Sequence, residues 1–145
     1  MADDRYPEET LGDNDDNGTM PESLEELSKA VVGHRIISAT TEKTPEYPGS
    51  SYITDSLVLT LDNGKRVILN ETNDCCAYTS VDKFFLDPAA VDHTVMGVGT
   101  TGSYTTWHIY ADFGDIMKLE VGWSCGNPFY YGYGFNIAVE EIEEQ

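Results

Sequence analysis

The sequence has few basic residues and no long apolar run. Of its 145 residues, 8 are Lys or Arg and 26 are Asp or Glu, so the formal net charge is −18. Without a basic stripe to displace phosphate counterions, direct binding to nucleic acid is not expected. The same charge disfavours anionic membranes. Because there is neither a signal-peptide apolar region nor a membrane-spanning stretch, we expect a cytoplasmic protein.

Cysteine is scarce, and the common motifs of catalysis are missing. Three cysteines without a signal peptide are expected to stay reduced. No second cysteine pair accompanies Cys75 and Cys76, and His34, His93 and His108 are too scattered to support zinc. The run at 97–102 (GVGTTG) lacks the lysine of a phosphate loop, which predicts a turn between strands. We therefore expect no metal and no cofactor, and the sequence leans away from an enzyme without excluding one.

The acidic residues gather at the two ends of the chain. Residues 1–26 hold ten of them against one base, and residues 140–145 hold four more. Residues 1–20 are too poor in apolar side chains to offset their ordering entropy, which predicts a disordered acidic tail. We expect a single folded domain over residues 21–142. Acidic ends ordinarily keep a protein soluble, and they also steer it towards a basic protein surface.

The pattern of the folded part changes from a helical period to a strand period near Gly33. Ser23 and Glu26 form a capping-box pattern, Leu24, Leu27 and Val31 share one helical face, and Gly33 is placed to end the helix. Strands are predicted over 34–42, 52–61, 65–71, 93–99, 104–113, 116–124 and 135–142. Asp62-Asn63-Gly64 predicts a hairpin between two of them, and residues 113–115 predict another.

A second short helix is predicted between these strands. Val81, Phe84 and Phe85 recur at helical spacing, so we expect a helix from about Tyr78 that stops before Pro88. Together these elements predict an α+β fold. Its mostly antiparallel sheet has about six strands, carries one or two short helices on one face and follows the disordered acidic tail.

Two stretches stand out as candidate binding sites. Residues 73–78 (NDCCAY) contain vicinal cysteines that either pack as small apolar residues or, ahead of a helix, gain thiolate character. Residues 123–134 interleave five aromatic residues with glycines, which is typical of a self-packed loop or a recognition surface. No catalytic residue is assigned; the candidate binding residues are Asp74, Cys75, Cys76, Tyr78, Trp123, Asn127, Tyr130, Tyr131 and Tyr133.

These two stretches together resemble an uncharacterised family of small domains found in phages and bacteria. The matching positions are Asp74, Cys75 and Cys76, followed by Ser124, Asn127, Tyr130, Tyr131 and Gly132. The resemblance covers about residues 31–142 and leaves the acidic tail outside it. It departs at Asn73, where the family's pattern has glycine. The resemblance implies a phage source and a fold unit, and it carries no assigned activity.

Three functions remain open at the level of sequence. The first is a non-catalytic protein-interaction module, encoded by a phage, that serves as a virion component or as a modulator of a host protein. The second is an acidic DNA mimic that inhibits a nucleic-acid-binding protein, although most of the charge lies at the ends of the chain. The third is a small enzyme or a ligand- or metal-binding protein that uses the Cys75–Cys76 corner. The sequence indicates neither the partner nor an oligomeric state.

Overall fold

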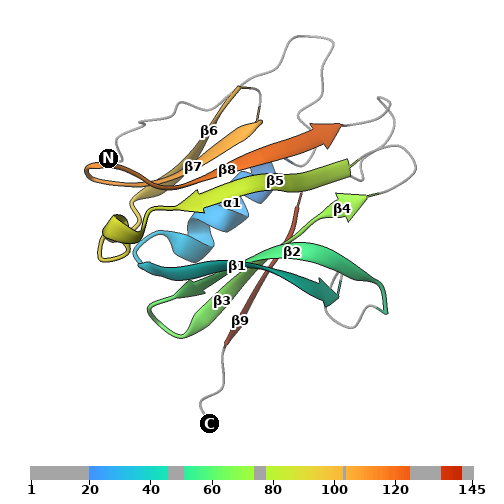
Figure 1. Cartoon of the computed structure of the whole chain (residues 1–145), viewed down its shortest axis with the longest axis horizontal. Helices are drawn as coiled ribbons and strands as arrows, with labels where there is room; N and C mark the ends of the chain where they lie inside the picture. The colour runs from blue at the N-terminus through green and yellow to red at the C-terminus, as the bar shows by residue number, and fades with distance from the viewer. Residues whose placement is uncertain (1–19, 46–50, 74–77, 103, 125–134, 142–145) are drawn as a thin grey trace.

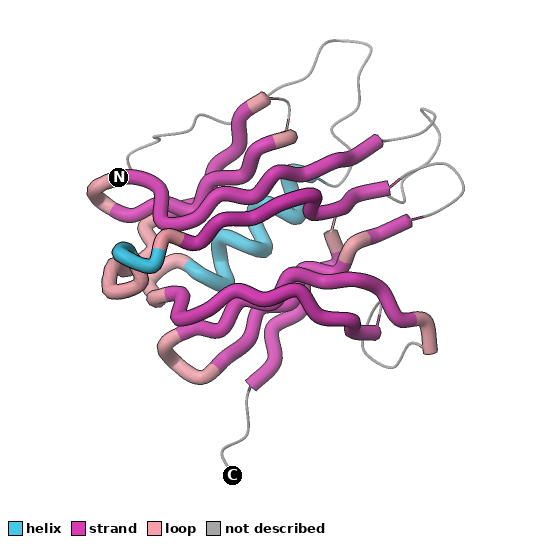
Figure 2. The backbone as a smooth tube through the Cα atoms, in the orientation of Figure 1, coloured by secondary structure: helices cyan, strands magenta, loops and turns pink. Residues whose placement is uncertain are grey.

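Two antiparallel sheets form most of the molecule, and one α-helix lies beside them (Figures 1 and 2). The computed structural model describes residues 20–45, 51–73, 78–102, 104–124 and 135–141. Strand order is β1-β2-β3-β9 in the four-stranded sheet and β4-β5-β8-β7-β6 in the five-stranded sheet. The expected α+β fold with one sheet of about six strands is therefore wrong, because the described chain is mostly β. The disordered tail predicted over residues 1–20 falls, except for Met20, outside the described residues.

The elements follow one another along the chain with short connections. Their bounds are α1 Met20–Val31, β1 Ile36–Pro45, β2 Ile53–Leu61, β3 Lys65–Asn70, β4 Thr72–Asn73, β5 Tyr78–Leu86, the 3₁₀ turn Pro88–Ala90, β6 Gly97–Thr101, β7 Thr106–Ala111, β8 Gly114–Ser124 and β9 Asn136–Glu141.

The first crossing of the chain from one sheet to the other takes a single residue. Asn70 ends β3, which pairs with β2 and β9, and Thr72 begins β4, which pairs with β5. Only Glu71 stands between them. An alternating apolar pattern shows that a strand has a buried face, but it does not show which sheet the strand joins. This is why one sheet was expected where two exist.

Helix α1 packs against strands of both sheets, mainly β6 and β9. Leu27 and Val31 are fully buried on its inner face, and Gly33 takes a left-handed φ of +88°, so both of these expectations are confirmed. The predicted capping box is wrong. The helix begins at Met20, three residues before Ser23, with proline in its first turn. Ser23 is buried instead, and its hydroxyl hydrogen-bonds the backbone N–H and C=O of Phe135.

The helix expected from Tyr78 to the residue before Pro88 is also wrong, because this segment is strand β5. Its pairing with β8 shifts register between Val81 and Lys83, which marks a β-bulge at Asp82. The bulge adds one residue, so Val81 and Phe84 both turn towards the core although they are three positions apart. An i, i+3 spacing that suggests a helix is here the spacing of a bulged strand.

The predicted hairpins are confirmed, but the turn expected at residues 97–102 is not. Gly64 has a φ of +83° between β2 and β3, and β7 and β8 pair up to Ala111 and Gly114. Residues 97–101 form β6, whose glycines lie opposite Tyr110 and His108 of β7. A Cβ atom built on Gly97 would lie 2.6 Å from Cζ of Tyr110. The glycines therefore leave room for side chains that lie across the strand.

The core between the sheets is apolar and continuous. It includes the fully buried Trp107 of β7, Leu119 of β8, Leu59 of β2 and Leu69 of β3. Burial of such side chains contributes about 25 cal/mol per Å² of apolar area removed from water. Within the described ranges, no helix has the length and apolarity needed to cross a membrane.

Candidate functional site

Of the nine candidate binding residues, the structure describes two. Tyr78 begins β5 and Trp123 lies near the end of β8, and the two strands pair there. Trp123 lies opposite Thr79 and packs edge-to-face against Tyr104, with ring centroids 6.3 Å apart, against the buried core. Tyr78 lies one position away, so it points to the other side of the sheet. The remaining candidates fall outside the described residues: Asp74, Cys75, Cys76, Asn127, Tyr130, Tyr131 and Tyr133.

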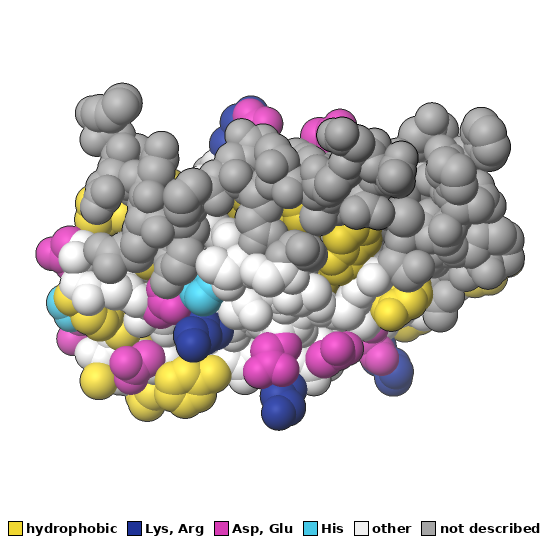
Figure 3. All heavy atoms as spheres, turned by 90° about the horizontal axis from the view of Figure 1, so that it is seen from above, with side chains coloured by type: hydrophobic (Ala, Val, Ile, Leu, Met, Phe, Trp, Pro, Cys, Tyr) yellow, Lys and Arg dark blue, Asp and Glu magenta, His cyan; other side chains and the backbone are white. Residues whose placement is uncertain are grey.

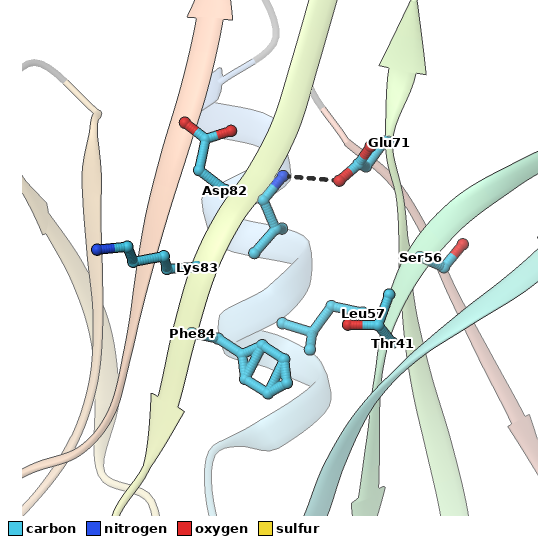
Figure 4. Close-up of a pocket in the computed structure, with 8 residues that line it drawn as sticks. Thr41, Ser56, Leu57, Glu71, Asp82, Lys83 and Phe84 are labelled. Atoms are coloured by element: carbon cyan, nitrogen blue, oxygen red, sulfur yellow. Dashed lines mark hydrogen bonds between the residues drawn. The ribbon is translucent and has the colours of Figure 1, made fainter.

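The sheets leave a cleft on the side where β1 and β2 face β5. One hollow in this cleft has a volume of about 240 Å³. Leu57, Val81 and Phe84 give it an apolar lining, and Thr41 adds a polar edge (Figure 4). Phe84 and Leu57 point towards one another across the space, from different sheets. The first hollow therefore presents apolar side chains of both sheets to an open cleft.

A second hollow, of about 570 Å³, shares Glu71 with the first. Ile53 of β2 and Tyr78 of β5 line it, and their exposed fractions are 56% and 44%. Lys43 and Asp55 lie in the same lining and form an ion pair at 2.7 Å. Hydrogen bonding to Asp55 raises the pKa of Lys43. The two hollows, which we call the inter-sheet cleft, thus combine exposed apolar side chains with paired charges.

Glu71 connects the two hollows at the point where the chain changes sheet. Its Oε2 accepts a hydrogen bond from the backbone N–H of Val81 at 3.0 Å (Figure 4). Burial raises the pKa of the Glu71 carboxyl group, and the Asp55 and Asp82 carboxylates add to the rise, while the Val81 amide and Lys43 oppose it. Glu71 therefore anchors the crossing and places a carboxyl group with a raised pKa in the cleft.

The edge of β5 faces the cleft but is poorly suited to accept another strand. Beyond Thr79, the described residues pair β5 only with β8. Glu71 already holds the Val81 amide, and the bulge at Asp82 breaks the regular edge. The cleft is consequently better suited to receiving side chains than to adding a strand.

A buried polar cluster supports the wall of the cleft. The Asn70 side-chain Nδ2 lies 2.7 Å from Thr44 Oγ1 and 2.7 Å from Ser56 Oγ, and 2.9 Å from the Pro45 carbonyl oxygen. Thr44 and Ser56 also hydrogen-bond to each other. Asn70 thus ties β1, β2 and β3 together beside the first hollow, which Ser56 lines.

A separate cluster, which we call the relay, lies on the outer face of the five-stranded sheet. Trp107, Ile109 and Ala111 of β7 enter the core, so His108 points outward. Its Nδ1 lies 2.8 Å from Asp115 Oδ2 and its Nε2 lies 2.8 Å from Thr101 Oγ1. From the sequence, His108 is considered only as a zinc ligand, and no spacing supports that role. The pairing register of β6, β7 and β8 brings the three residues together, and the sequence carries no spacing motif for them.

The charges of the described residues that are visible from above are mixed. Figure 3 views the molecule from above, and there the carboxylates of the described residues are interspersed with basic side chains. Among the residues with described positions, no group of three His, Cys, Asp or Glu side chains is arranged to hold a metal ion.

The chain matches one known family. The model of a domain of unknown function, DUF7448, matches residues 29–137, which span the chain from the end of α1 into β9. No curated protein and no solved structure matches the chain. The expected membership in an uncharacterised domain family is confirmed. The chain belongs to the DUF7448 family of domains of unknown function.

Proposed function

We propose that the chain is a protein-interaction module that contacts its partner at the inter-sheet cleft. One observation carries this proposal: Ile53 and Tyr78, from different sheets, are both largely exposed and line the same hollow. Tyrosine and aliphatic side chains in a partly apolar depression are typical of the residues that dominate binding energy at interfaces. Together, Ile53 and Tyr78 form a surface that we call the apolar rim.

The chemistry of the rim favours a protein partner with a basic surface. The net charge of −18 steers a positively charged surface towards the chain. Of the charged groups in the cleft, Asp55 already has Lys43 as a partner, whereas Glu71 bonds a backbone amide. A basic side chain of the partner would offset the charge of Glu71 while the apolar rim contributes burial.

DNA mimicry is less well supported than protein binding at the inter-sheet cleft. A mimic needs carboxylates held at fixed spacings without neighbouring cations, as in a phosphate backbone. Among the described residues, several carboxylates have a basic partner instead: Asp55 has Lys43, Asp62 has Arg35, and Glu42 has Arg66. These pairs break up the negative field that mimicry requires.

The source and setting of the module follow from the family resemblance. We propose a phage-encoded accessory protein that acts either in the virion or on a host protein in the host cytoplasm. The Asp-Cys-Cys sequence at 74–76 and the Tyr-Tyr-Gly sequence at 130–132 support this source. Tyr78, two residues after the cysteines, lines the cleft and links the first motif to the proposed contact surface.

The proposal is tested by comparing variants of the full chain as bait. A double variant, Ile53→Asp with Tyr78→Ser, removes the apolar rim, and Phe85→Ser is the matched control. Phe85 is an equally exposed aromatic residue of β5, 62% accessible, that does not line either hollow. We expect a partner captured from cells that express the gene, and identified by mass spectrometry, to be lost with the double variant and kept with Phe85→Ser. Retention by the double variant would rule out the cleft as the contact surface.

A further inference from the structure

The relay has a defined direction of hydrogen bonding. A carboxylate only accepts hydrogen bonds, so His108 Nδ1 carries the proton that bonds Asp115 at 2.8 Å. In the neutral imidazole, Nε2 is then the acceptor, and the Thr101 hydroxyl donates to it at 2.8 Å. A hydroxyl that donates to an imidazole whose other nitrogen is held by a carboxylate has the order of groups found in activated nucleophiles.

The burial of the three residues differs in the way that such chemistry requires. The His108 side chain is 9% exposed and the Asp115 side chain is 20% exposed, whereas Thr101 is an exposed residue. The base and its carboxylate are therefore largely shielded from water, while Thr101 lies at the surface. Gly99 lies opposite His108 in the pairing of β6 and β7, so no side chain of β6 separates the imidazole from Thr101.

The backbone directly after Thr101 is unusual. Gly102 has a φ of +67°, and Tyr104 has a φ of +63°, a conformation that a tyrosine rarely adopts. Thr105 Oγ1 donates to the Gly102 carbonyl, and Trp107 Nε1 donates to the Tyr104 carbonyl at 3.0 Å. The bond from Trp107 helps to hold Tyr104 in this conformation, and non-glycine residues with such backbone angles cluster at functional sites.

We propose that Thr101 is a nucleophile that accepts an acyl group from small esters, with His108 as its general base and Asp115 as a positioning residue. This activity goes beyond the proposed binding function and uses none of the residues that line the cleft. It also departs from the non-catalytic module expected from the sequence. The substrate class is an unhindered acyl ester, because Thr101 is an exposed residue.

The reaction balances with the ester and water as its only reagents. Thr101 Oγ1 adds to the ester carbonyl carbon while its proton moves to His108 Nε2. The bond from that carbon to the leaving oxygen then breaks, and His108 returns the proton to the leaving alkoxide. The product is an acyl-threonine ester and a free alcohol. Water, with His108 again as base, hydrolyses the ester to a carboxylic acid and restores the hydroxyl.

The competing explanation is that the relay only ties three strands together. Thr101 lies on β6, His108 on β7 and Asp115 in β8, so the two hydrogen bonds also join neighbouring strands. A purely structural relay would stabilise the fold but would leave Thr101 no more reactive than other exposed threonines. Reactivity at one defined hydroxyl therefore separates the two explanations.

The test uses the full chain and p-nitrophenyl acetate as the probe. We expect release of p-nitrophenolate together with one acetyl group on Thr101, located by mass spectrometry of the intact chain and of its peptides. Thr101→Val should abolish this adduct, while Thr101→Ser should keep it. The matched control is Thr40→Val, since Thr40 is an exposed strand residue whose hydroxyl bonds a carboxylate, Glu42, at 3.0 Å and no imidazole.

Asp115→Asn separates positioning from structural support. The variant removes the carboxylate that fixes the imidazole tautomer, so the rate of acetylation at Thr101 should fall by about 10-fold or more while circular dichroism shows the same fold. Acetylation confined to lysines or to cysteines, or an unchanged rate at Thr101 in a folded Asp115→Asn chain, would overturn the proposal. If Thr101→Val does not fold, the folded Thr101→Ser chain decides: an adduct at position 101 supports the proposal, and its absence overturns it.

Discussion

Replacing Asn70 with alanine should destabilise the protein far more than the loss of one exposed amide would. Asn70 is 2% exposed, and its Nδ2 lies within hydrogen-bonding distance of four oxygens on β1 and β2. An amide has two protons, so about two of these bonds form at a time. Each contributes about 1 kcal/mol net, and the buried Thr44 and Ser56 hydroxyls would lose their amide donor. The expected loss is about 2–4 kcal/mol.

Urea unfolding followed by tryptophan fluorescence measures this loss, because Trp107 is fully buried in the core. For a chain of this size, the loss corresponds to a fall in Tm of roughly 10 °C. The matched control is Asn63→Ala, since Asn63 is exposed and its Oδ1 accepts one backbone hydrogen bond from Lys65 at 3.0 Å. If Asn70→Ala costs no more than Asn63→Ala, the polar cluster does not support the cleft wall and the reasoning fails.

Three further changes should be measurable in the same unfolding assay. Gly97→Ala should destabilise by about 1–3 kcal/mol, since its Cβ would overlap the Tyr110 ring; no loss would mean that the ring moves freely. Thr100→Val should stabilise by about 1 kcal/mol, because the buried Thr100 hydroxyl has no hydrogen-bond partner among the described residues; a loss of stability would indicate a partner for it. The pKa of Glu71 is raised above its ordinary 4.5, so the folded state binds a proton more readily than the unfolded state. The contribution of this group to stability therefore falls as the pH rises from 4.5 through the raised pKa. The free energy of unfolding of Glu71→Gln should therefore rise relative to that of the wild type as the pH rises from about 4.5. A difference between the two that stays constant with pH would contradict the raised pKa.

Local patterns predicted those elements whose structure depends on nearby residues. The inner face of α1 follows from Leu27 and Val31 at helical spacing, and the β2–β3 hairpin follows from Asn63-Gly64. Both need only contacts within a few residues or one buried stripe. The helix boundary was missed because Ser23, which suits a cap, is instead bonded to Phe135, 112 positions away. Such a partner leaves no trace in the local pattern.

The candidate sites depended even more on distant pairing. Tyr78 was singled out beside the cysteines, and the structure places it in the cleft. Ile53, which lies across the cleft from Tyr78, belongs to no sequence motif. It becomes part of the site only because the two sheets pack together. The relay required the register of three strands, which sets His108 between Thr101 and Asp115. A shift of one residue in any of these strands would separate the three side chains, and no local signal fixes that register.

The pairing of β3 with β9 determines when this protein can fold during its synthesis. Strand β3 (residues 65–70) cannot pair with β9 until residues 136–141 have been synthesised. In the same way, Ser23 of α1 cannot form its hydrogen bonds until Phe135 has been added. Until the last strand leaves the ribosome, β3 has an open edge that carries Val67 and Leu69, both bound for the core. The emerging chain is therefore open to association with other chains until residues 136–141 have emerged. Truncation before β9 should therefore promote aggregation, because pairing with β9 covers the exposed edge of β3.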